Sequence, residues 1–167
     1  VTVDIPAGVC ASSVGGYNNL AATPFSIIYD STSPIFTITS TESSPTSSTT
    51  IPLTITVNET CTTFLYTEVV VDNGSFAGWT QDANTYTIHN FSPNSEGLVT
   101  VDIPAGVCTD DAGNSNTAAT QFSITHDRTG PTPFISSSVI SPTNNSTIPI
   151  TVAFNESVTD FEEGDLY

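Results

Sequence analysis

Alternation of apolar and polar residues is the dominant pattern along this chain. It is clearest in ITV, TYTIHNF, LVTVDI and TQFSITHD, which are rich in β-branched and aromatic residues. A period of two is typical of half-buried antiparallel strands, because successive side chains point to opposite faces. No segment shows a helical period. Seven strands are predicted, at residues 36–40, 51–58, 64–71, 75–80, 85–91, 97–103 and 118–126.

Turn residues (Gly, Pro, Asn, Asp and Ser) separate these strands at intervals of about 8 to 12 residues, which is typical of β-sandwiches. The predicted fold class is therefore all-β, an immunoglobulin-like antiparallel β-sandwich. The core is predicted to contain Trp79, Tyr86, Ile88, Val99, Val101, Phe122 and Ile124. An alternative role for Trp79 is an exposed ring that stacks on a ligand, although a lone tryptophan on a strand is more often a core residue.

An internal duplication organises the chain. The ten residues VTVDIPAGVC occur at 1–10 and again at 99–108, and AATPFSIIYDSTSP at 21–34 aligns with AATQFSITHDRTGP at 118–131. TIPLTITVNE at 50–59 aligns with TIPITVAFNE further along. The offset is 98 residues before Gly15–Gly16 and 97 after it. Such self-similarity predicts tandem repeats of about 97 residues.

The duplication also predicts domain boundaries. Residues 34–130 form one complete repeat, residues 1–33 (the head segment) the C-terminal part of a preceding repeat, and residues 131–167 (the tail segment) the N-terminal part of the next. Residues 71–98 have no counterpart in either end segment. We therefore expect a window on a longer array, or a subunit that its neighbours complete. The expected partners are neighbouring repeats or copies of the chain itself in a filament.

Charge and composition exclude some partners. The chain has 17 acidic residues against the single base Arg128, a net charge of −16. Such acidity disfavours nucleic acid and anionic membranes, which attract Lys and Arg. No run of 18 apolar residues occurs, so no segment is expected to insert into a membrane. Ser and Thr together number 50, as in many secreted, glycosylated β proteins. An extracellular or cell-surface location is therefore expected.

Several motifs resemble those of a known family. IPAGV, DDAGN, the D-x-T-x-P linker and FNESVTDFEEGDL are similar to the bacterial-type Ig-like tandem repeats of large surface adhesins and extracellular fibre proteins. The resemblance covers nearly the whole chain and implies a shaft or spacer that assembles end to end. The alternative is an adhesin module whose loops bind a glycan or receptor. The motifs vary along the array, since SSVGGYN replaces DDAGN in the first copy.

No catalytic constellation accompanies these motifs, so the chain is not expected to be an enzyme. Neither His89 nor His126 has a Cys or His at metal-ligand spacing, and no G-x-S-x-G or P-loop is present. His126 is replaced by Tyr29 in the first copy, as expected of a packing position. The adjacent acids Glu162 and Glu163 could serve a glycosidase, but a repeating, nearly base-free module is a poor host for one.

Calcium at the junction between modules is the sharpest chemical hypothesis, although no cofactor is required by the fold. Ca²⁺ prefers six to eight carboxylate and carbonyl oxygens. The predicted ligands are Asp110, Asp111, Asn114, Asp127, Glu156 and Asp165. At the preceding junction Asp30 and Glu59 remain, but residues 12–16 supply no carboxylate, so calcium is less expected there. The competing interpretation is an Asx-rich turn at 110–114 and a turn-forming aspartate in the linker.

The chain contains three cysteines, Cys10, Cys61 and Cys108. Cys10 and Cys108 occupy the same repeat position, so a Cys61–Cys108 disulfide is predicted within the complete repeat. It would close a loop of about 47 residues, worth ~4 kcal/mol by chain entropy, and suits an oxidising compartment. Cys10 would then pair with a cysteine of the preceding module. The alternatives are a Cys10–Cys61 bridge or free buried thiols.

Six N-glycosylation sequons suggest covalent glycans. They are at Asn58, Asn73, Asn90, Asn144, Asn145 and Asn155. This is only slightly more than a chain so rich in Ser and Thr would carry at random. The shared repeat position of Asn58 and Asn155 is more informative than the number, and Pro93 is expected to weaken the sequon at Asn90.

Overall fold

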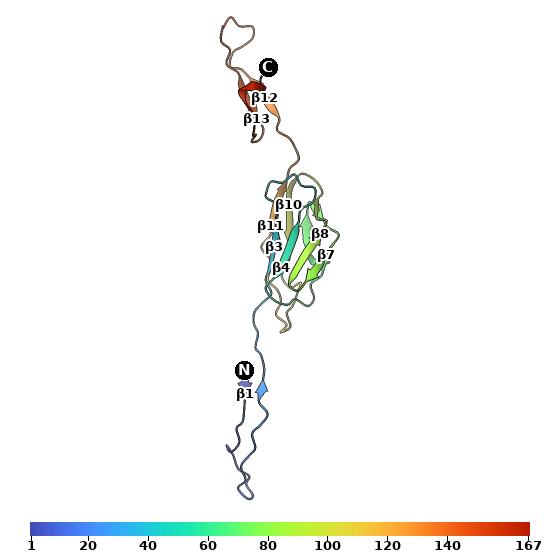
Figure 1. Ribbon diagram of the computed structural model, residues 1–167, viewed down its shortest axis with the longest axis vertical. Helices are drawn as coiled ribbons and strands as arrows, with labels where there is room; N and C mark the ends of the chain where they lie inside the picture. The colour runs from blue at the N-terminus through green and yellow to red at the C-terminus, as the bar shows by residue number, and fades with distance from the viewer. The chain divides into compact units, whose positions relative to one another are not determined.

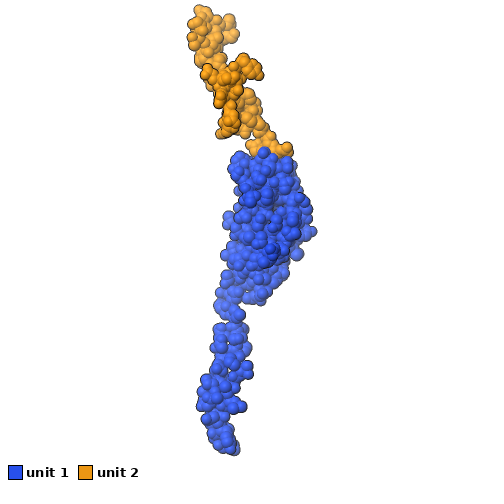
Figure 2. Space-filling model, viewed as in Figure 1, with its two compact units in different colours: residues 1–126 blue, residues 127–167 orange.

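The computed structural model describes all residues from Val1 to Tyr167. Its regular structure consists of β-strands and two short 3₁₀ turns (Figure 1), so the predicted all-β class is confirmed. The chain divides into two compact units, residues 1–126 and 127–167 (Figure 2). None of its helical segments has the length and apolar character needed to cross a bilayer.

The larger sheet of the first unit has four antiparallel strands. Their order is β3 (Phe36–Ser40), β4 (Leu53–Val57), β8 (Thr85–His89) and β7 (Gly78–Asp82). Buried and solvent-accessible residues alternate along β3 and β4. The inward positions are aliphatic or aromatic, and the outward positions are largely threonine, such as Thr37 opposite Thr56. This distribution is the physical basis of the period-two pattern in the sequence.

The facing sheet has three strands in the order β11 (Phe122–His126), β10 (Gly97–Asp102) and β5 (Val70–Asp72). A separate two-stranded sheet pairs β6 (Gly74–Ser75), which follows β5 in the chain, with β9 (Ser92–Pro93), which precedes β10. β10 and β11 pair from Gly97 opposite His126 to Val101 opposite Phe122. The loop between them therefore leaves the sheet at the end away from His126.

Side chains from both sheets form one hydrophobic cluster. Five predicted core residues are buried: Tyr86, Ile88, Val99, Val101 and Ile124. The other two, Trp79 and Phe122, are half-buried and pack against the cluster. The ring of Trp79 lies 4.9 Å from that of Phe64 and 4.8 Å from that of Tyr86. Trp79 is thus part of an aromatic cluster at the core margin, where such pairs stabilise the fold.

Three predicted strands differ from the structure by more than two residues at one end or are divided. The strand expected at 64–71 is replaced by a 3₁₀ turn, Tyr66–Glu68, before β5. The Glu68 carboxylate accepts a hydrogen bond from the Leu65 amide at 2.9 Å, and this local bond favours a turn over a strand. The strand expected at 75–80 is split between β6 and β7, and β11 begins four residues later than predicted.

The two end segments repeat parts of the module. In the head segment, β1 (Thr2–Val3) pairs with β2 (Phe25–Ser26), as β10 pairs with β11. In the tail segment, β12 (Pro133–Ser136) pairs with β13 (Thr151–Phe154), as β3 pairs with β4, and a 3₁₀ turn follows at Glu163–Asp165. The division into one whole and two partial repeats remains a prediction, because contacts group the head segment with the module.

Loop hydrogen bonds are also repeated. The amide nitrogen of Asn116 donates to the carbonyls of Pro104 and Thr117 at 2.9 and 2.8 Å. Asn19, its counterpart, makes the equivalent bonds at 2.9 and 2.8 Å. Asn58 and Asn155 each accept a backbone amide at 2.6 Å, from Ile35 and Thr132. The same local sequence therefore forms the same loop, whether or not a sandwich surrounds it.

Candidate metal site

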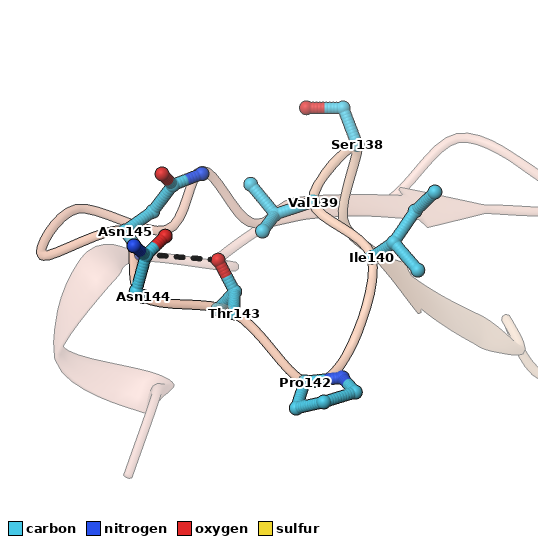
Figure 3. A pocket seen from close by; sticks show the side chains of 7 residues that line it. All are labelled: Ser138, Val139, Ile140, Pro142, Thr143, Asn144 and Asn145. Carbon is cyan, nitrogen blue, oxygen red and sulfur yellow. Dashed lines mark hydrogen bonds between the residues drawn. The ribbon is translucent and has the colours of Figure 1, made fainter.

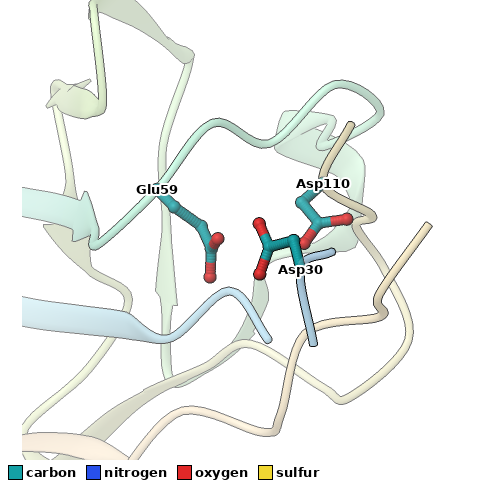
Figure 4. A group of neighbouring side chains, drawn as sticks. All are labelled: Asp30, Glu59 and Asp110. Carbon is teal, nitrogen blue, oxygen red and sulfur yellow. The ribbon is translucent and has the colours of Figure 1, made fainter. Parts of the chain in front are cut away.

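Three carboxylates from distant parts of the chain meet at one end of the sandwich. Asp30 lies in the segment that leads into β3, Glu59 follows β4, and Asp110 lies in the loop between β10 and β11. One oxygen of each lies within 4.8 Å of the others, and Figure 4 shows the three side chains converging. Together with Thr60 and Asp111 they line a hollow of about 230 Å³. No Lys or Arg belongs to this group.

A turn holds Asp110 in place. Its Oδ1 accepts the backbone amides of Ala112 and Asn114 at 2.9 and 2.8 Å, and its Oδ2 accepts the Asn114 side-chain amide at 2.9 Å. The same Asn114 amide donates to the backbone carbonyl of Asp30 at 3.2 Å. Asn114 thus connects the loop to the segment before β3. These hydrogen bonds, first that from the Asn114 side chain, lower the pKa of Asp110 below its ordinary value.

The pKa of Glu59 is shifted in the opposite direction. Desolvation raises its pKa above the ordinary value, and the negative charges of Asp30 and Asp110 raise it further. A hydrogen bond from the Asn58 amide, at 3.4 Å, only partly offsets these effects. In the cluster the ionised form of Asp110 is therefore favoured, whereas the ionised form of Glu59 is disfavoured. A divalent cation would relieve this repulsion, and carboxylate oxygens are among the ligands that Ca²⁺ prefers.

The structure groups the acidic residues differently from the predicted junction site. Of the six predicted ligands, Asp110 is in the cluster, Asp111 lines the hollow and Asn114 holds the loop. The other three lie in the second unit. There Asp127 Oδ1 accepts the Thr129 amide and Asp165 Oδ2 accepts the Glu162 amide, which is the role of a turn former. Glu156 has a buried Oε1 without a hydrogen-bond partner.

The strand directions place the Asp110 loop at the end of its sheet away from Asp127. Asp110 follows β10, whereas Asp127 comes directly after His126 at the far end of β11. The loop therefore meets the linker that precedes its own module. Sequence reasoning named Asp30 and Glu59 only as a weaker set. The signal that could have identified them was the succession of strands 97–103 and 118–126, because antiparallel pairing of the two fixes the end of the sheet at which the loop between them lies.

A second hollow, of about 650 Å³, lies in the loop between β12 and β13. It is lined by Ser138, Val139, Ile140, Pro142, Thr143, Asn144 and Asn145 (Figure 3). All of these belong to one loop, and none carries a charge. The hollow therefore has no converging groups for catalysis or for a metal.

The disulfide and the sequons can also be located. Cys61 and Cys108 are joined, with Cα atoms 5.8 Å apart, and Cys10 is an exposed free thiol. Among the sequons, the Asn73 amide donates to the carbonyls of Ser95 and Leu98 at 3.1 and 3.2 Å. A glycan on that nitrogen would remove one of these bonds.

The remaining five sequon asparagines are exposed: Asn58, Asn90, Asn144, Asn145 and Asn155. Use of any sequon stays a prediction.

Comparison with known proteins supports the fold-level interpretation. A family model described as "Bacterial Ig-like domain" matches residues 30–125, which is more than half of the chain. No curated protein and no solved structure shows a significant match. The matched range begins at Asp30 and includes the whole carboxylate cluster. With two facing antiparallel sheets around one core, this chain belongs to the bacterial Ig-like domain family.

Proposed function

We propose that the chain is a structural module of an extracellular fibre or cell-surface adhesin shaft, in which Ig-like modules follow one another end to end. The observation that carries this proposal is the repetition of backbone interactions. Asn19 and Asn116 make the same hydrogen bonds in equivalent loops. Asn58 and Asn155 each accept the backbone amide of the residue just before β3 or β12. A shaft needs many copies of one unit, whereas catalysis or recognition needs only one.

The distribution of side chains supports a spacer over a glycan-binding module or an enzyme. The ring of Trp79 packs among Phe64, Tyr66 and Tyr86, so this aromatic cluster is used for packing. The larger hollow is uncharged and belongs to a single loop. A disulfide and an outward face rich in threonine suit an oxidising extracellular environment.

We further propose that Ca²⁺ binds at Asp30, Glu59 and Asp110 and fixes the segment that enters the module. Asp30 belongs to the chain leading into β3, while Glu59 and Asp110 belong to the module itself. A cation bridging them would couple the direction of the incoming chain to the sandwich. The effect on an array would be a more rigid joint in calcium than in chelator.

Electron microscopy of the native material tests the structural role. Negatively stained particles are expected to be fibres or extended rods with a regular repeat along their length. Compact, isolated particles in the native material would contradict the proposal. Calcium binding is tested separately by titration calorimetry on the chain, with Asp30→Asn as the variant and Asp82→Asn, on β7, as the control. Equal heats from both variants and the parent would exclude this site.

A further inference from the structure

The loop between β3 and β4 is rich in side-chain hydroxyl groups. Eight of the ten residues from 41 to 50, TESSPTSSTT, are Ser or Thr. The loop has no regular secondary structure, and its residues are exposed except for the buried Thr46 and the half-buried Glu42 and Ser48. Because it connects two paired strands of the complete module, its exposure is a property of the folded sandwich.

Two of these hydroxyls hold the loop in place. Ser44 Oγ accepts the Thr125 amide at 3.0 Å. Thr46 Oγ1 donates to the Glu42 carboxylate at 3.0 Å and accepts the Ser48 amide at 3.1 Å. A substituent on Thr46 Oγ1 would remove the donated hydrogen bond and would not fit at a position that is only 8% exposed.

Four consecutive hydroxyls, those of residues 47–50, have no such structural role. The segment lies between two fixed points, because the Thr46 amide donates to the Thr125 carbonyl and the Ile51 amide to the Phe91 carbonyl, both at 2.9 Å. The hydroxyls of residues 47–50 themselves make no hydrogen bond within the chain. A substituent on any of them would therefore break no hydrogen bond of the fold.

The corresponding loop of the tail segment carries a different modification signal at the same positions. Asn144 and Asn145 replace Ser47 and Ser48, and each begins an N-glycosylation sequon. Thr143 keeps the role of Thr46, since its Oγ1 accepts the Asn145 amide at 3.0 Å (Figure 3). The threonine that holds the loop is thus retained, while the exposed positions beside it change from hydroxyl to amide. Both groups are acceptors for sugars.

We propose that residues 47–50 are a site of O-linked glycosylation, whose substrate is a nucleotide sugar. Stretches rich in Ser and Thr that contain proline are typical carriers of such glycans, and Pro45 lies in this loop. In the transfer, the hydroxyl oxygen bonds to C1 of the sugar and the bond between C1 and the diphosphate of the donor breaks. The hydroxyl proton passes to a base of the transferase, and the nucleoside diphosphate leaves.

Threonines on the outward face of the sheet are poorer acceptors than those of the loop. Thr54 and Thr56 lie on β4, which is paired on both sides, and Thr56 has Thr37 and Thr85 as its cross-strand neighbours. Neighbours of this kind have Cβ atoms about 4.5–5.5 Å apart, which leaves little room for a sugar ring on either one. Accessible loops are also the segments that modifying enzymes reach most easily.

The position of the loop makes this modification compatible with the proposed calcium site. Thr46 pairs with His126 in a parallel bridge, so the loop lies beside the residue at which the chain leaves the module. The Asp110 loop lies at the other end of β10 and β11. Sugars on residues 47–50 would therefore surround one end of the sandwich and leave the carboxylates uncovered. The modification does not depend on the end-to-end arrangement.

Peptide mapping of the native material tests the site. A protease that cuts after glutamate releases residues 43–59 as one peptide, because Glu42 and Glu59 are successive glutamates. N-glycosidase first removes N-linked sugar, and electron-transfer dissociation then locates what remains. Hexose or N-acetylhexosamine is expected on residues 47–50, with Thr54 and Thr56 unmodified. A peptide without sugar, or with sugar only outside residues 47–50, would overturn the proposal.

A variant made in the organism that produces the chain provides the matched control. Alanine at all four positions 47–50 is expected to abolish the added mass of this peptide, whereas Thr54→Ala should retain it. Both variants should keep the circular dichroism spectrum of the parent, because neither removes a hydrogen bond that holds the loop. A fourfold variant that keeps the added mass would refute the site. Fibres that carry no sugar on this peptide would do so as well, although they would still support the structural role.

Discussion

At the residue scale, buried amides hold the loops of this module. Asn116 is 3% exposed and uses its whole side chain, donating two hydrogen bonds and accepting one from the Cys108 amide at 3.0 Å. Its counterpart Asn19 makes the same bonds in the head segment. The loop geometry therefore depends on one asparagine more than on the sandwich around it. In the module the Cys108 amide is buried and needs this partner, because water cannot reach it.

Replacing Asn116 by Ala is expected to lower the free energy of unfolding by about 1–3 kcal/mol, because buried backbone groups lose their partners. Urea denaturation of the two proteins measures this difference. Asn84→Ala is the matched control, since the Asn84 side chain is half-buried and makes no hydrogen bond. Equal midpoints for both variants would contradict this role of Asn116.

Two carboxylates of the cluster, Asp110 and Glu59, are expected to change the stability of the fold with pH in opposite directions. The lowered pKa of Asp110 stabilises the fold above the ordinary aspartate pKa, and this contribution is lost as pH falls through the lowered value. The raised pKa of Glu59 favours the fold below the ordinary glutamate pKa. That contribution is lost as pH rises through the raised value.

In chelator at neutral pH, Glu59→Gln is therefore expected to be more stable than the parent, and the difference should disappear in acid. Urea titrations at both pH values measure it. Excess calcium should reverse the order if Glu59 is a ligand, because only the parent then gains binding free energy. A variant that is less stable than the parent in chelator would show that Glu59 does not experience this repulsion.

At the element scale, the disulfide connects the turn after β4 with the loop after β10. It joins residues 47 apart in sequence, and Thr62 adds hydrogen bonds to the Thr109 carbonyl beside it. The corresponding position in the tail segment is Val158, so the repeat also accommodates an apolar residue there. The disulfide is thus an additional constraint on a contact that the fold makes without it.

Removing this constraint with the double substitution Cys61→Val and Cys108→Val is expected to lower the free energy of unfolding by ~4 kcal/mol, chiefly by releasing the unfolded chain. The strands should remain, as judged by an unchanged far-ultraviolet circular dichroism spectrum. Equilibrium unfolding of the oxidised parent and the variant measures the loss. A change below about 1 kcal/mol would mean that the unfolded chain is already restricted there.

At the scale of the whole molecule, stability is unevenly distributed between identical sequences. Residues 1–10 and 99–108 have the same ten side chains, but only the second stretch lies in a packed sandwich. β10 is central in its sheet, hydrogen-bonded on both sides, whereas β1 has one partner. Local opening should therefore be much easier in the head segment.

Amide hydrogen exchange followed by NMR is expected to be at least about a hundredfold slower at Val101 than at Val3 in dilute solution, because central strands open only with the whole module. The shared sequence removes differences in intrinsic exchange rate. Equal protection at low concentration would contradict the contrast in packing.

The sequence by itself determined the strands, the inward-facing residues and the repeated loops. These features depend on local alternation and on short-range hydrogen bonds, so identical stretches such as 1–10 and 99–108 form the same hairpin. Only the tertiary structure decided that Asp110 meets Asp30 and Glu59, because that contact depends on where the β10–β11 loop returns after two strands have paired. The turn at Tyr66–Glu68 was also missed. The Glu68 carboxylate accepts a hydrogen bond from the Leu65 amide, which favours a turn in a segment whose residues are typical of a strand.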